Sequence, residues 1–78
     1  MEVKTSAELL KMYDKVSPFF EEKAQACKNN RWFHIHTDGS LLYEKTYDWV
    51  GRFCGGVARA QDGVVEILIN IDGEQTFL

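Results

Sequence analysis

The sequence of 78 residues predicts an α+β fold, in which an N-terminal helical segment packs on an antiparallel β-meander of about five strands. The first observation is a change of hydrophobic period near residue 30, from helical spacing to alternation. The second is a series of three Asp-Gly pairs after that point, which are strong hairpin signals. Together they divide a single domain, residues 1–78, into a helical cap over 1–30 and β-hairpins over 31–78.

The helical segment begins at a capping box, Thr5-Ser6-Ala7-Glu8, in which the side chains of the first and last residues bond the opposite backbone amides. Pro18 interrupts the helix and suits the first position of a second one, over 18–28, which Asn29-Asn30 ends. We expect the cap to bury its large apolar residues against the sheet: Leu9, Met12, Val16, Phe19 and Phe20.

The second part of the chain reads as β-structure because apolar and polar residues alternate between turn signals. The clearest example is the run with Val65, Ile67 and Ile69 on one face. An Asp-Gly pair suits a type I′ turn, which needs positive φ at both central residues. The expected strands are 32–37, 40–45, 56–61, 64–71 and 74–78.

Composition excludes several classes of protein. The net charge of −3 and the scattered basic residues argue against a nucleic-acid partner, which would require a basic stripe. There is neither an apolar stretch long enough to cross a membrane nor a signal-peptide pattern, so we expect a cytoplasmic protein without a membrane partner. Cys27 and Cys54 form no Cys-x-x-Cys pair and are expected to be free thiols, packed as small hydrophobic residues.

Residues 31–44 recur in weakened form as residues 65–78, with Asp38-Gly39 matching Asp72-Gly73 at an offset of 34 residues. A period of this length is typical of repeat arrays, in which one unit cannot bury its own apolar face. The sequence therefore predicts one full unit, less than half of a second, and a cap over one end.

The spacing of these residues resembles the WG-repeat family, also called KWG repeats. The residues that carry the resemblance are Arg31-Trp32, Ile35, Gly39, Tyr47-Asp48, Val50, Phe53 and Gly56-Val57-Ala58. Two positions depart from the family pattern: Phe33 stands where a glycine follows the tryptophan, and Glu66 stands where the second tryptophan is expected. The resemblance covers residues 31–78 and implies a β-hairpin repeat with a binding surface; it supplies no catalytic residues and no cofactor.

The leading functional hypothesis is a non-enzymatic interaction module or regulator. Its C-terminal edge, residues 74–78, has no charged side chain after Glu74 to discourage strand addition, so we expect it to bind a protein partner or a second copy. The residues predicted to form the partner surface are His34, His36, Trp49, Arg52, Gln75 and Phe77.

The alternative hypothesis is a small metal-binding or hydrolytic protein built on His34, His36 and Cys54. Two imidazoles on one strand face can begin a metal site, although such sites usually need three or four ligands. A cysteine nucleophile would need a neighbouring cation and an orienting group. The competing interpretation is a solvent-facing strand with a structural, buried Cys54.

Overall fold

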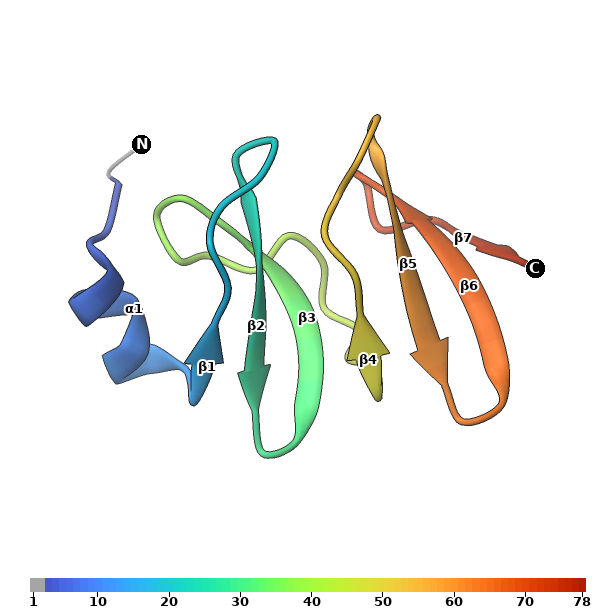
Figure 1. Ribbon diagram of the computed structural model, residues 1–78, viewed down its shortest axis with the longest axis horizontal. Helices are drawn as coiled ribbons and strands as arrows, with labels where there is room; N and C mark the ends of the chain where they lie inside the picture. Colours follow the sequence, from blue (N-terminus) through green and yellow to red (C-terminus); the bar gives the residue numbers. More distant parts are fainter. Residues whose placement is uncertain (1–2) are drawn as a thin grey trace.

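The computed structural model describes residues 3–78 and places two antiparallel sheets one after the other along the long axis of the molecule (Figure 1). The first sheet has the order β1-β2-β3 and the second the order β4-β5-β6-β7. The combination of helix and antiparallel strands is confirmed, but the single meander of five strands is wrong. The elements are α1 (Ser6–Met12), β1 (Lys15–Val16), β2 (Lys23–Lys28), β3 (Arg31–His36), β4 (Trp49–Val50), β5 (Val57–Asp62), β6 (Val65–Asn70) and β7 (Gln75–Phe77).

The helix α1 begins at the predicted capping box, which is confirmed. The hydroxyl of Thr5 accepts a hydrogen bond from the amide of Glu8, and the carboxylate of Glu8 accepts one from the amide of Thr5. The helix has 7 residues and one fully buried side chain, Leu9. Within the described residues no helix is long and apolar enough to traverse a bilayer.

The second predicted helix, over 18–28, is wrong, because β2 occupies the latter half of this range. Ala24 and Ala26 are both buried, which is the alternation of a strand. Pairing with β1 on one side and β3 on the other satisfies the backbone of β2. Left-handed backbone angles form the hairpin turns at the two ends of β2, at Glu21, Glu22, Asn29 and Asn30.

The Asp-Gly pairs turn the chain as predicted, but by a different geometry. Only the glycine of each pair has a positive φ, 86° at Gly39 and 83° at Gly73. The amide of Gly39 donates to the carbonyl of His36, and the amide of His36 donates to the carbonyl of Ser40. The loop at Gly39 is therefore a longer hairpin loop with the glycine in the left-handed position, rather than a type I′ turn.

The predicted strand over 40–45 is also wrong. Leu41 makes only an isolated bridge to Ile35, after which the chain leaves the first sheet for the second. A second bridge, between Trp32 and Tyr47, joins β3 to the residues just before β4. This segment is therefore the connection between the sheets rather than part of either.

The two sheets belong to two complete copies of one unit, residues 13–43 (unit 1) and residues 47–77 (unit 2). Their first residues read YDKVSPF and YDWVGRF. The carboxylate of Asp14 accepts a hydrogen bond from the amide of Asn29 at 2.9 Å, and its equivalent Asp48 accepts one from the amide of Gly63 at 2.6 Å. The expectation of one full unit and a truncated second is thus corrected.

Each unit has its own buried core, and the two cores share three equivalent positions: Ala26 and Ala60, Phe33 and Ile67, and Ile35 and Ile69. Tyr43 packs against both cores and links them. The core of unit 1 contains Leu9, Ala24, Ala26, Phe33 and Ile35, and the core of unit 2 contains Tyr47, Val50, Ala60, Ile67 and Ile69.

Leu9 of α1 takes the place in unit 1 that Tyr43 takes in unit 2. A Cβ atom added to Gly39 would lie 3.0 Å from Cδ2 of Leu9. One added to the equivalent Gly73 would lie 2.7 Å from Cβ of Tyr43. α1 therefore covers the first end of the stack, in place of a preceding unit.

Three residues of the predicted cap, which we expected to be buried against the sheet, are exposed. Met12, Phe19 and Phe20 keep 38%, 37% and 39% of their surface. Phe19 is equivalent to Phe53, which is fully buried because unit 1 lies against it. Among the described residues no unit precedes Phe19, so the same side chain stays at the surface.

Candidate interaction surface

The contact between the units shows which face of unit 1 a following unit covers. Four side chains on that face touch unit 2, and each does so through a specific contact. We call this set the covered face: Phe20, Lys23, Gln25 and His34.

His34 is the centre of the covered face and is completely buried. Its Nδ1 lies 2.6 Å from the hydroxyl of Tyr43, and its Nε2 lies 2.7 Å from the carbonyl of Gly51. Since a carbonyl can only accept, Nε2 carries the proton, and neutral Nδ1 accepts from Tyr43. Burial lowers the pKa of His34, against the opposing effect of the carbonyl of Gly51.

Two sequence predictions for His34 are therefore corrected. Strand alternation put it on a solvent face with His36, but unit 2 covers that face, so His34 is not part of a partner surface. Both of its ring nitrogens have partners within the chain and are not available to a metal. Within residues 3–78 there is no group of three or more histidine, cysteine or acidic side chains that could hold a metal ion.

We expect the protein to lose stability on mild acidification because of His34. Its folded pKa lies below the ordinary value of about 6.5, so the unfolded chain binds a proton that the folded chain excludes. The contribution is complete above that pH and decreases as the pH falls through and below it. Melting temperatures at pH 7.5 and 5.5 should differ more for the native protein than for His34→Gln, and equal differences in the two proteins would contradict this role of His34.

The remaining members of the covered face hold the edges of the contact. The guanidinium of Arg52 lies 4.3 Å from the ring centroid of Phe20, and the ammonium of Lys23 lies 5.3 Å from that of Phe53. The amide group of Gln25 reaches the carbonyl of Val50 at 3.5 Å. The predicted partner residue Arg52 is exposed, as expected, but its guanidinium already contacts the ring of Phe20 in unit 1.

Glu21 closes the contact between the units at the next turn. Its carboxylate accepts hydrogen bonds from the amides of Gly55 at 2.7 Å and Gly56 at 3.1 Å. These two bonds lower the pKa of Glu21. The turn of unit 2 is thus held by a side chain of unit 1.

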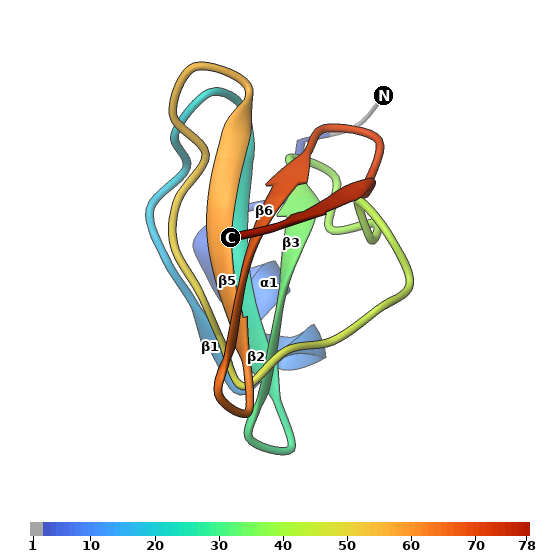
Figure 2. The same ribbon diagram turned by 90° about the vertical axis from the view of Figure 1, so that its right-hand side faces the viewer.

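The equivalent face of unit 2 is open. Moving the covered face forward by one unit gives a set that we call the open face: Cys54, Val57, Arg59 and Leu68. Arg59 and Leu68 are paired neighbours on β5 and β6. Figure 2 looks at this end of the molecule, with the second sheet nearest the viewer.

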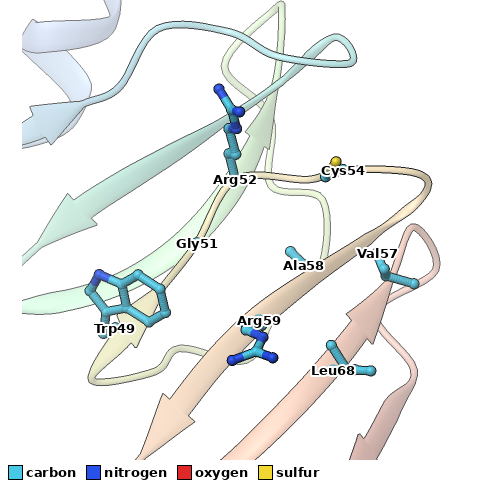
Figure 3. Close-up of a pocket in the computed structure, with 8 residues that line it drawn as sticks. All are labelled: Trp49, Gly51, Arg52, Cys54, Val57, Ala58, Arg59 and Leu68. Atoms are coloured by element: carbon cyan, nitrogen blue, oxygen red, sulfur yellow. The ribbon is translucent and has the colours of Figure 1, made fainter.

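A cleft of about 380 Å³ lies over the open face (Figure 3). Its lining is mostly apolar and includes two arginines and no carboxylate. Cys54, predicted to be a buried structural thiol, is exposed here, while Cys27 is buried. The residues that line the cleft are Trp49, Gly51, Arg52, Cys54, Val57, Ala58, Arg59 and Leu68.

The structure separates the other predicted surface residues. Trp49 is half-exposed in the cleft, and Phe77 keeps 66% of its surface on the edge strand β7. Gln75 is half-buried, and its side-chain amide donates to the hydroxyl of Tyr47. His36 is also half-buried and lines a separate hollow with Glu22. Trp49 and Arg52 thus meet at the cleft, Phe77 lies at the neighbouring edge, and sequence reasoning missed Val57 and Leu68.

The sequence profile of the family described as WG-containing repeats matches residues 10–32 and 35–63 of the chain. Each matched segment contains one copy of the Tyr-Asp-x-Val-x-x-Phe block, at residues 13–19 and 47–53. The first match corrects the expectation that residues 1–30 lie outside the repeat. Comparisons with curated proteins and with solved structures found no match.

Proposed function

Because the chain belongs to the family of WG-containing repeats, we propose that it is a small, non-enzymatic interaction module that binds a protein partner through its open face. The open face carries the proposal, because unit 2 covers the equivalent face of unit 1. The open face and the edge beside it present exposed apolar side chains, including Val57 at 42% and Phe77 at 66% of their free surface. Exposed apolar clusters rimmed by charge are typical of protein-binding surfaces.

The edge strand β7 supports the same reading. It pairs with β6 on one side and is the last strand of its sheet within the described residues. Thr76 and Phe77 are exposed, and the strand carries neither a charge nor a proline. Such an edge can accept a partner strand, so β7 would extend the surface of the open face, toward a partner protein or a second copy.

The two free thiols support a reducing compartment, so we place the protein in the cytoplasm. The acidic net charge and the absence of a basic stripe favour a protein partner over nucleic acid. A membrane partner has no feature in its favour on this surface, since the two arginines are accompanied by few other cations.

The test is affinity capture from the native host with three baits: the native chain, Leu68→Glu and Leu10→Glu. Leu68 lies in the cleft, while Leu10 is an exposed leucine on α1, at the opposite end of the molecule. A charge in a desolvated contact is expected to reduce affinity by at least about tenfold. The native chain and Leu10→Glu should capture one common protein that Leu68→Glu loses. The loss should recur with the purified partner in calorimetry; equal capture by all three baits would refute the proposed surface.

A further inference from the structure

We infer that the partner of the open face is a repeat unit of the same kind, seated on unit 2 as unit 2 is seated on unit 1. This inference rests on the proposed function and specifies the chemistry of the partner. It follows from the contact between the units, which is the template for what a following unit needs.

The apolar part of the template transfers directly. In the contact between the units, the ring centroids of Phe53 and His34 are 4.5 Å apart, and the ammonium of Lys23 lies over the ring of Phe53. On the open face these positions belong to Leu68 and Val57. A phenylalanine of an incoming unit would therefore pack on two aliphatic side chains, and the desolvation of a histidine and a lysine would not be needed.

The polar part of the template sets a preference for the partner. Gln25 donates to the carbonyl of Val50, and Arg59 at the equivalent position can donate to a backbone carbonyl in the same way. In unit 2 the residue equivalent to Glu21 is Gly55, so the open face has no carboxylate to hold the next turn. Because Arg59 lines the cleft on the open face, an incoming unit with acidic side chains beside its turn is favoured.

A second copy of this chain does not meet the requirement while its helix is in place. In the contact between the units, Gly73 of unit 2 has no side chain, and this leaves the space that Tyr43 of unit 1 occupies. A docking unit must offer the same space, which we call the glycine slot. In unit 1 the equivalent slot, at Gly39, is already filled by Leu9 of α1. The partner is therefore a unit without such a helical cap.

The exposed thiol of Cys54 provides a direct reporter of docking, since the other cysteine is buried. The probe is a synthetic peptide of residues 45–78 with Cys54→Ser, which supplies a whole unit, including Gly73. At a peptide concentration about ten times its Kd, alkylation of Cys54 in the full-length chain should slow about tenfold. A matched peptide that also carries Phe53→Ala should give no protection. Leu68→Glu and Val57→Asp in the full-length chain should abolish the effect, and Leu10→Glu should keep it.

A covalent version of the test does not depend on the peptide folding in solution. Residues 45–78 are appended after Leu78, which continues the 34-residue period and holds the third unit at a millimolar effective concentration. The extended chain should melt at a higher temperature and protect its original Cys54, and Leu68→Glu should remove both gains. If the extended chain shows neither gain, the inference is overturned.

Two outcomes separate the inference from the proposed function. If a partner captured through Leu68 contains no such repeat and the third unit does not dock, the inference fails while the interaction module stands. If sedimentation shows that the native chain self-associates and Leu68→Glu abolishes it, the occupant is a second copy, and the argument from the cap is overturned.

Discussion

Replacing Phe53 with alanine is expected to remove most of the stability of the protein, whereas the same change at the equivalent Phe19 should cost little. The side chain of Phe53 is fully buried between the units, against the ring of His34. Truncation of a buried phenylalanine typically costs about 3–5 kcal/mol. A core of this size supplies only about 3–5 kcal/mol in total, so Phe53→Ala should be largely unfolded.

Phe19 is the matched control, because it holds the same position in the repeat and differs only in its surroundings. It keeps 37% of its surface at the end covered by α1. Urea denaturation followed by circular dichroism would give the free energy of unfolding of both variants. Similar losses at the two positions would mean that burial between the units is not what distinguishes them, and the stacking described here would be wrong.

The second half of the chain was predictable because its turns are made of glycine. Gly39, Gly63 and Gly73 mark the ends of strands whose alternation is clear, and the predicted strands over 56–61, 64–71 and 74–78 agree with β5, β6 and β7 to within one or two residues. The exposed position of Trp49 also agrees with its place in the predicted partner surface.

The first half was misread because its turns are made of other residues. Glu21 and Glu22 occupy the positions of Gly55 and Gly56, and take the left-handed backbone at φ of 52° and 63°. Glutamate gives no local signal for such a turn, and its presence in a run with Pro18 favoured a helix. The bonds from the carboxylate of Glu21 to unit 2 help to hold this conformation, and no sequence pattern reveals them.

One signal could have found unit 1. The block Tyr13-Asp14-x-Val16-x-x-Phe19 precedes the equivalent block Tyr47-Asp48-x-Val50-x-x-Phe53 by the same 34 residues that separate the Asp-Gly pairs. Extending the repeat backwards would have replaced the second helix by a hairpin. The open face would then have followed, because its members are the equivalents of residues that the next unit covers.

The second large effect is expected at Gly73, where a side chain is excluded by both backbone and space. Its φ of 83° lies in the left-handed region, which costs an alanine about 1–3 kcal/mol in strain. An added Cβ would also lie 2.7 Å from Cβ of Tyr43, closer than such atoms approach. Forcing the two apart in a packed contact adds about 1–3 kcal/mol. Gly73→Ala should therefore lose up to the whole stability of the domain.

Gly63→Ala isolates the contribution of the contact. Gly63 also has a positive φ, 63°, but nothing lies within 4 Å of an added Cβ, so this variant carries the strain alone. The difference between the two free energies of unfolding measures how closely Tyr43 approaches the turn of unit 2. Tyr43→Ala should not rescue Gly73→Ala, because the clashing atom is the Cβ that alanine keeps. Equal losses in Gly63→Ala and Gly73→Ala would mean that the segment carrying Tyr43 is free to move away, and that the two units are joined more loosely than their contacts indicate.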